Sequence, residues 1–242
     1  LDGFLKLCRA LKAKAQPPGF ALGHATGDAN GWTHWVMWAF GGRLTDENSQ
    51  LALNSKETIA ALDYAKQMYE TFAPGTLSWL DPSNNKAFLA GEIGLTMNGI
   101  SIYYAAKTSP DPRLKAIAAD IQHAKFPIGP IGREVHAGLM FPGAIYRYSK
   151  YPNAAKEYLR FIMEREQYEL WQRASIGFIS HTLRAYDANP VWTDDPQHMF
   201  YRDIARGSRH SGYAGRLSKE SAAVLADFII VDMFGEVCTG QQ

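Results

Sequence analysis

The stretch Phe88–Gly99 has the sequence FLAGEIGLTMNG, which predicts the end of a helix followed by a strand. The helix over Lys86–Ala90 stops at Gly91, because glycine readily takes the left-handed conformation that closes a helix. The apolar run Ile93–Met97 is bounded by glycines and is typical of a strand covered on both faces. The pair Asn98-Gly99 then lies at the carboxyl end of a parallel strand, where open α/β sheets bind ligands. An ordinary helix–strand unit without a site is the alternative.

Length and composition restrict the class of protein. The chain has 242 residues, which is enough for one or two domains. With 46% hydrophobic and 20% charged residues it is typical of globular proteins and unlike disordered ones. A net charge of +1 gives no global field that would attract nucleic acid or an anionic membrane. No apolar run approaches the roughly 20 residues that a membrane-spanning helix needs.

A polar, glycine-rich loop over residues 23–31 precedes an aromatic-rich helix predicted for Trp32–Phe40. The free amides of such a helix start, with Asp28 or Asn30 as the cap, suit a polar ligand. A plain turn with a helix cap explains the pattern equally well. The loop is not a dinucleotide fingerprint, because its glycine spacing is wrong and no phosphate-binding lysine follows.

In their order along the chain, these features resemble the extracellular solute-binding proteins of ATP-binding-cassette importers. The nearest group is the sugar-binding family that includes maltose-binding protein. The resemblance rests on FLAGEIGLTMNG, on the aromatic helix that closes at Gly41-Gly42, and on a glycine-bearing strand at residues 135–145. It spans nearly the whole chain. One departure is Ser180, which stands where the family commonly has proline in the pattern Gly-x-x-Pro.

The resemblance implies an α/β fold, a periplasmic-binding-protein-like lobe with a mixed or parallel sheet flanked by helices. It assigns residues 1–124 and 190–242 to the second, C-terminal lobe. Residues 125–189 become a crossover segment that belongs to the first lobe. The chain is then expected to be a fragment that lacks the N-terminal part of lobe 1, with a signal peptide expected in that missing part.

The resemblance also implies a site. Aromatic faces take the apolar side of a sugar and polar side chains take its hydroxyls, with Trp32, at the helix entrance, as the stacking platform. Tyr103 has packing against the core as an alternative role. The expected ligand-binding residues are Asp28, Asn30, Trp32, Asn98, Ser101, Tyr103, Met140, Phe141 and Tyr213.

The function implied is that of the solute-binding component of an importer. It captures a small polar solute, a carbohydrate, in a cleft between two lobes and delivers it to the membrane permease. The expected location is periplasmic or extracytoplasmic, and no cofactor, metal or nucleic acid is expected to take part.

Two other classes of function are alternatives. An α/β hydrolytic or metal-dependent enzyme would assemble a site from the set His24, Asp28, His34, His123 and His136. No two histidines have the spacing of a helical zinc motif and no nucleophile elbow occurs, so no catalytic residue is predicted. A ligand-free interaction domain is the third class, and it would bind nothing in a metabolite screen. Cys8 and Cys238 share no metal-binding spacing.

Overall fold

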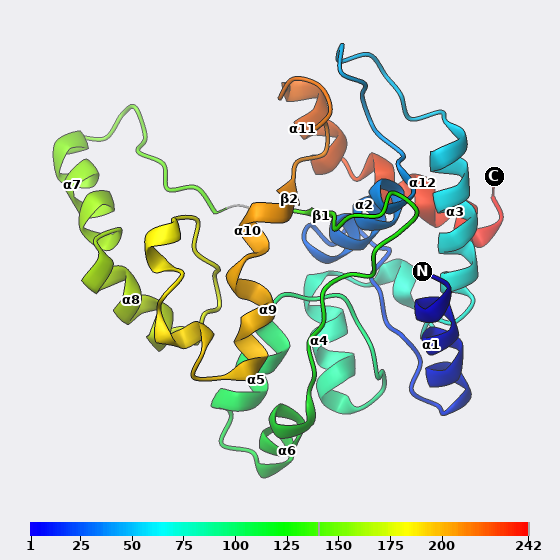
Figure 1. Ribbon diagram of the computed structural model, residues 1–242, viewed down its shortest axis with the longest axis horizontal. Helices are drawn as coiled ribbons and strands as arrows, with labels where there is room; N and C mark the ends of the chain where they lie inside the picture. Colours follow the sequence, from blue (N-terminus) through cyan, green and yellow to red (C-terminus); the bar gives the residue numbers. More distant parts are fainter. Residues whose placement is uncertain (140, 242) are drawn as a thin grey trace. The chain divides into compact units, whose positions relative to one another are not determined.

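The computed structural model describes residues 1–139 and 141–241 and is shown in Figure 1. The chain forms two compact units. Unit 1 comprises Leu1–Asp120, Lys125–Gly138 and Gly207–Gln242, and unit 2 comprises Ile121–Ala124 and Leu139–Arg206. Which lobe each unit represents stays a prediction.

Unit 1 is built mainly from helices. In chain order they are α1 (Asp2–Ala13), α2 (Asp28–Phe40), α3 (Lys56–Tyr69), α4 (Asp81–Ala90), α5 (Ser101–Thr108), α6 (Pro112–Asp120), α11 (Lys219–Ala226) and α12 (Ile229–Thr239), with a short 3-10 helix, η1 (Thr76–Ser78).

Helix α2 is the centre of the unit 1 core. It packs against α3, α12 and the short strand β1 (His136–Ala137). Because its sequence is apolar on nearly every side, it is stable only when covered all round. Its tryptophans Trp32, Trp35 and Trp38 are all fully buried, and Trp35 stacks on Phe126 with ring centroids 4.5 Å apart.

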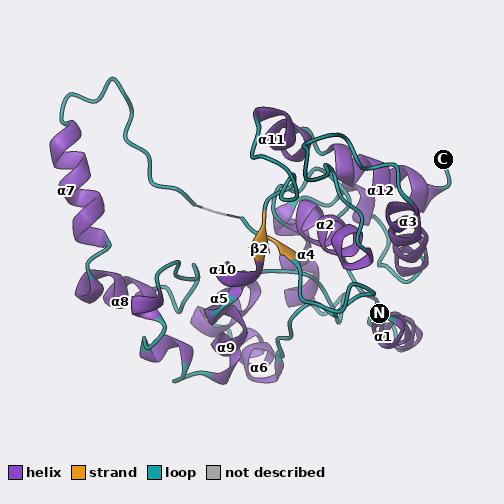
Figure 2. Cartoon of the chain, turned by 45° about the horizontal axis from the view of Figure 1, so that its top comes forward, coloured by secondary structure: helices purple, strands orange, loops and turns teal. Residues whose placement is uncertain are grey.

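Strand pairing is sparse in the described residues (Figure 2). The named sheet is parallel and joins β1 to β2 (Ser208–Arg209). The run predicted as a buried strand, Ile93–Met97, is extended but forms only an isolated parallel bridge, Pro18 to Leu95. Its partner segment contains Pro17 and Pro18, and because proline has no N–H, these two residues can accept but cannot donate hydrogen bonds of a ladder.

The helical segment at the C-terminal end of unit 1 is interrupted at Phe228. Helix α11 ends at Ala226, and α12 begins at Ile229. Between them Phe228 has a φ of 58°, a left-handed conformation that is strained for a bulky aromatic residue. The break turns the Phe228 ring out of the helical register, so the ring packs beside His24 with centroids 4.5 Å apart.

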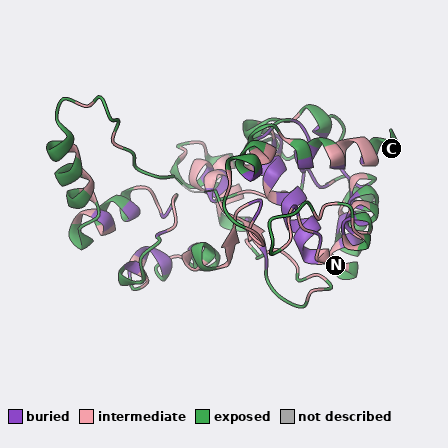
Figure 3. Cartoon of the chain, turned by 90° about the horizontal axis from the view of Figure 1, so that it is seen from above, coloured by how far each residue is buried: buried purple, intermediate pink, exposed green. Residues whose placement is uncertain are grey.

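Unit 2 has a smaller core. Its helices are α7 (Pro152–Ile162), α8 (Arg165–Ala174), α9 (Met199–Arg202) and α10 (Ile204–Gly207), which ends at the unit boundary, with 3-10 helices η2 (Arg184–Tyr186), η3 (Pro190–Trp192) and η4 (Pro196–His198). Tyr168 stacks on Tyr186 at 4.3 Å, and the buried amides of Gln172 and Asn189 bond at 3.0 Å. Buried positions are marked in Figure 3.

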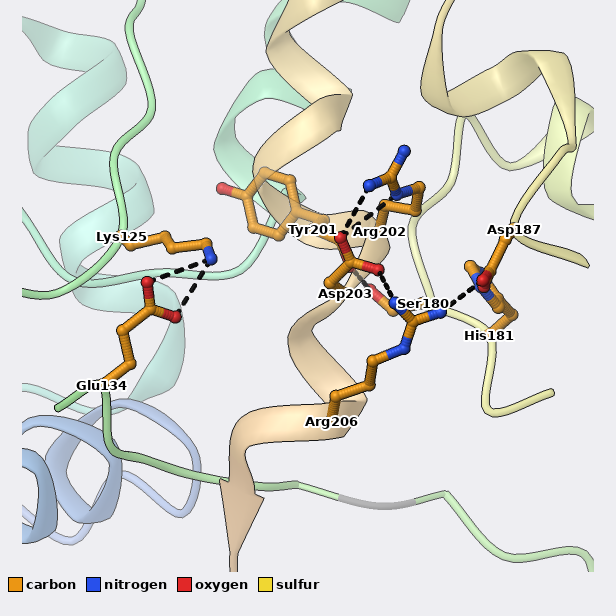
Figure 4. Close-up of polar contacts among 9 residues, drawn as sticks. All are labelled: Lys125, Glu134, Ser180, His181, Asp187, Tyr201, Arg202, Asp203 and Arg206. Atoms are coloured by element: carbon orange, nitrogen blue, oxygen red, sulfur yellow. Dashed lines mark hydrogen bonds and ion pairs between the residues drawn. The ribbon is translucent and has the colours of Figure 1, made fainter. Parts of the chain in front are cut away.

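A polar network joins several elements of unit 2 (Figure 4). The buried His181 bonds to Asp187 at 2.7 Å, and Arg206 joins the carboxylates of Asp187 and Asp203. These partners lower the pKa of Asp187, with the His181 hydrogen bond as the largest cause. The network therefore ties η2 to α9 and α10. Figure 4 also draws an ion pair of unit 1, Lys125 to Glu134 at 3.0 Å.

Both cysteines are buried, and in the described part of the chain both are free thiols. Burial raises the pKa of Cys8 to about 11 and that of Cys238 to about 12, which keeps each protonated. Among residues 1–139 and 141–241, no helix has the length and apolar character needed to cross a membrane.

Candidate functional site

The start of α2 is capped by a residue from another helix. The carboxylate of Asp81 accepts backbone N–H groups from Thr26 and Gly27 at 2.9 Å and from Asp28 at 3.0 Å. Asp81 is itself the first residue of α4, followed by Pro82, an arrangement that favours a helix start. A negative charge at a helix N-terminus is stabilised by the exposed amides and the helix dipole. One carboxylate thus fastens the loop over residues 23–28 to α4.

Next to Asp81 the site contains the neutral side-chain amides of Asn85 and Asn98 and the hydroxyl of Ser101. The Asn98 side-chain N–H donates to the Asn85 amide oxygen at 2.5 Å, and the Asn85 amide donates to Ser101 Oγ at 3.0 Å. Ser101 Oγ in turn donates to the Asn98 amide oxygen at 3.1 Å. The three side chains form a closed ring of hydrogen bonds and are each half-buried. We call the partly accessible set Thr26, Asp81, Asn85, Asn98 and Ser101 the polar rim.

A deeper layer holds the rim in place. Asn84 is fully buried and donates to Thr96 Oγ1 at 3.2 Å and to the Met97 carbonyl at 3.0 Å. It also hydrogen-bonds Asp28, which is 9% exposed. Burial, with the nearby charge of Asp81 as the second cause, raises the pKa of Asp28 to about 7. This layer links α2, α4 and the segment that leads into α5.

An aromatic pair flanks the same loop. His24 lies parallel to Phe228, with an angle of 1° between the rings, and His24 Nε2 bonds to Asp232 at 2.9 Å. The His24 side chain remains 57% exposed. The loop therefore has a second attachment, to α12, and carries a flat aromatic ring beside its polar groups.

Comparison with protein families identifies this architecture. A model of the bacterial extracellular solute-binding protein family matches residues 1–200. The chain belongs to this family. No curated protein matches the sequence.

Solved structures agree with the family on the fold. Maltose-bound MalE3 of T. maritima aligns with 100% of this chain at a TM-score of 0.78 and 17% identity. A provisionally assigned oligosaccharide periplasmic-binding protein from Synechococcus sp. MITs9220, in complex with zinc, aligns with 100% of the chain at a TM-score of 0.68 and 14% identity. The chain spans 60% of the length of each of these structures. The predicted fold, a periplasmic-binding-protein-like α/β lobe, is confirmed.

Four of the predicted site residues of this solute-binding protein gather near the polar rim. Asn98 and Ser101 belong to the rim itself and bond each other. Asp28 lies directly beneath it, against Asn84 and Asp81. Asn30 is buried in the next part of α2, where its amide donates to the Leu225 carbonyl at 3.3 Å. Neither Asp28 nor Asn30 caps α2 with its side chain, which corrects that expectation, because Gly27 is the N-cap residue and Asp81 supplies the acceptor.

Trp32 does not fit its predicted role. It is fully buried, its indole N–H donates to the Ala21 carbonyl at 2.6 Å, and the rings of Phe20, Phe72 and Phe234 pack around it. Helix α2 begins four residues earlier than expected, so Trp32 lies in its second turn rather than at its entrance. With no exposed face, Trp32 is a core residue and not a stacking platform.

The remaining predicted residues lie elsewhere. Tyr103 is 4% exposed and its hydroxyl accepts from Lys107 Nζ at 3.1 Å, which favours the packing role. Tyr213 packs edge-on against Trp38, and the Arg209 guanidinium lies 4.7 Å from its ring centre. Phe141 belongs to unit 2 and is 69% exposed. Met140 falls outside the described residues.

The site also uses residues that the sequence did not predict, among them Thr26, Asp81, Asn85 and Phe228. Asp81 meets the loop from 53 to 55 residues away, and Phe228 meets His24 from the opposite end of the chain. Asp81-Pro82 is a helix-start signal, but nothing in its local pattern indicates which helix its carboxylate would cap.

The histidines considered for an enzyme are held in separate contacts. His24 bonds Asp232, His34 bonds Ser211 Oγ at 3.0 Å, and His123 bonds the Gln197 carbonyl at 3.1 Å. His136 bonds Ser208 Oγ at 3.1 Å. In the described part of the chain, no three His, Cys, Asp or Glu side chains are placed to hold one metal ion.

Proposed function

We propose that this chain is the solute-binding component of an ATP-binding-cassette importer and that it captures a carbohydrate or similar polyol on the polar rim. The observation that carries the proposal is the ring of neutral hydrogen-bonding groups formed by Asn85, Asn98 and Ser101 in a member of a solute-binding family. Amides and hydroxyls both donate and accept, as sugar hydroxyls do. Maltose, bound to the similar T. maritima protein, is therefore the first probe.

His24 replaces Trp32 as the proposed aromatic contact. Its side chain is more than half exposed, and Phe228 supports one face of its ring. A flat, supported ring can cover the apolar face of a sugar while the rim amides meet its hydroxyls. The strained backbone of Phe228 supports a functional role for this pair, since strain tends to persist where a site needs it.

Capture would follow the two-lobe mechanism of the family. A solute that contacts both walls favours the closed state by its higher affinity for that state. The closed, loaded protein would then dock on the membrane permease outside the cytoplasm, in the periplasm. Asp28 and Asn30 support the rim from behind in this proposal, and Phe141 stays a predicted ligand contact.

A thermal-shift screen of the chain against neutral sugars, with maltose included, tests the proposal. A ligand that binds only the folded state raises the melting temperature by mass action. We expect at least one neutral sugar to raise it in a saturable manner, with sugar phosphates and amino acids as comparison solutes. No shift with any sugar, or a shift only with the comparison solutes, would contradict the proposal.

Titration calorimetry with the sugar found in the screen then locates the site. Replacing Asn98 by alanine removes rim hydrogen bonds and should cost about 0.5–1.5 kcal/mol for each hydrogen bond to the sugar, or about twofold to tenfold in Kd. Asn48→Ala is the matched control, because Asn48 is an exposed asparagine in a turn of unit 1 remote in sequence from the rim. Equal effects in the two variants would place the solute elsewhere.

A further inference from the structure

Two aspartates, Asp81 in the polar rim and Asp28 beneath it, have very different surroundings. Asp81 is exposed, and its negative charge is met by three backbone N–H groups. Asp28 is only 9% exposed, and among the described residues its Oδ2 atom has no hydrogen-bond partner. A charged carboxylate with an unpaired oxygen is costly to bury, whereas the neutral acid is much less so. The surroundings therefore stabilise a negative charge on Asp81 but not a second one on Asp28.

We propose that Asp28 carries a proton while the loop over residues 23–28 is seated on α4, and that loss of this proton loosens the loop. Asp28 is then a positioning residue, since it acts on the solute only through the loop and the rim. This inference goes beyond the proposed function and does not depend on which solute is bound.

The groups around Asp28 support this assignment. Desolvation is the largest cause of its raised pKa, and the charge of Asp81, from α4, is the second. The hydrogen bond from Asn84, also from α4, acts in the opposite direction without cancelling them. The histidines of α2 and of the loop have other partners: His34 bonds Asn30 and Ser211, and His24 bonds Asp232. Asp28 therefore has no cation to neutralise it in the described part of the chain.

Ionisation of Asp28 would act directly on the hydrogen bonds that hold the loop over residues 23–28 to Asp81. Its backbone N–H is one of the three that Asp81 accepts, so the two carboxyl groups are held close through that contact. A second negative charge there repels the first and draws water toward the buried oxygen. The expected result is weaker bonding of Thr26 and Gly27 to Asp81 as the pH rises through about 7.

Carboxyl carbon NMR on the ¹³C-labelled chain measures the first part of the proposal, with Asp28→Asn to assign the signal. We expect the Asp28 carboxyl to titrate with a midpoint of about 7. In Asp81→Asn, which removes the facing charge, the midpoint should fall. A midpoint near 4 in the unaltered chain, close to the ordinary value of aspartate, would overturn the proposal.

Amide hydrogen exchange measures the second part. The protection factors of Thr26 and Gly27, corrected for intrinsic exchange, should fall about tenfold between pH 6 and pH 8 in the unaltered chain, a change equal to about 1.4 kcal/mol. Asp28→Asn, which mimics the neutral acid, should abolish the fall, and the control Asp63→Asn on exposed α3 surface should retain it. Identical profiles in all three proteins would overturn the proposal. Neither readout needs a solute, so failure here leaves the proposed function standing.

Discussion

Helices α3 and α7 are both amphipathic but have very different surroundings. In α3, residues such as Tyr64 and Met68 are buried where the helix meets α2 and α12. In α7, none of the described residues is buried, and Tyr158 and Phe161 on its apolar side are 64% and 49% exposed. Periodicity therefore specifies which face of a helix is apolar. Whether that face is covered depends on what the rest of the fold places against it.

The same contrast separates the two units. Unit 1 surrounds three fully buried tryptophans with helices, whereas unit 2 buries Trp192 and a few polar and aromatic side chains. Apolar area removed from water is the main favourable contribution to folding. We expect the stability of the chain to reside mainly in unit 1, which also carries the proposed site.

The largest expected effect is that of Trp32→Ala. Loss of a fully buried indole, together with its hydrogen bond to Ala21, should lower the free energy of unfolding by about 3–5 kcal/mol. Tyr158→Ala on exposed α7 should change it by less than about 1 kcal/mol. Urea denaturation followed by circular dichroism and tryptophan fluorescence measures both. Equal costs would show that α7 is covered in solution and would break the comparison.

The second prediction concerns pH and uses two buried groups of α2. The pKa of Asp28 is raised from 3.8 to about 7, so between these pH values the folded state keeps a proton that the unfolded chain loses. The contribution of Asp28 to the free energy of unfolding therefore declines as the pH rises from 3.8 to about 7. The pKa of His34 is lowered by burial from 6.5 to about 4, so the unfolded chain gains the proton first, and stability rises with pH over that range. The two slopes oppose each other.

Between pH 4.5 and pH 6.5, the contributions of these two groups to the free energy of unfolding of the unaltered chain should therefore nearly cancel. In Asp28→Asn only the His34 contribution remains, so the free energy of unfolding should rise with pH by up to about 1.4 kcal/mol per pH unit. In His34→Gln only the Asp28 contribution remains, so the free energy of unfolding should fall with pH at a similar rate. Chemical denaturation at three pH values decides the matter. Parallel curves for all three proteins would contradict the assigned burial of these groups.

The smallest effect expected is at the helix caps. Ser55 Oγ accepts the Thr58 N–H at the start of α3, and Ser55→Ala should cost about 1 kcal/mol. Tyr151, the N-cap residue of α7, makes no side-chain cap bond and is 74% exposed, so Tyr151→Ala should be nearly neutral. Melting temperatures of the two variants, measured side by side, test this. A larger loss at Tyr151 would mean that its ring packs against something in solution.

Local sequence signals located much of this architecture. The glycine stop at Gly91 and the double glycine after α2 were correctly predicted, and Gly91 and Gly41 both take the left-handed conformation. Asn98 and Ser101 were placed together because they follow the same extended run. The strand itself was overestimated, since apolar content at Ile93–Met97 carries no information about the prolines in the segment it pairs with.

What could not be predicted depends on contacts distant in sequence. An α-helix that begins at Asp28 instead of Trp32 moves Trp32 from an entrance into the core, and that shift depends on Asp81 capping the earlier turn. The pairing of His24 with Phe228 depends on a left-handed residue between α11 and α12, for which the sequence has no glycine. Such long-range features need the fold itself.

The most direct test of the polar rim as the solute site is NMR mapping of the ¹⁵N-labelled chain. The probe is the neutral sugar that most raises the melting temperature, beginning with maltose. The account predicts the largest saturable shifts at the Thr26 amide and at the amides of Asn85, Asn98 and Ser101, with little change at Asn48. Shifts confined to α7 and α8 of unit 2, or none at the rim at saturating sugar, would contradict it.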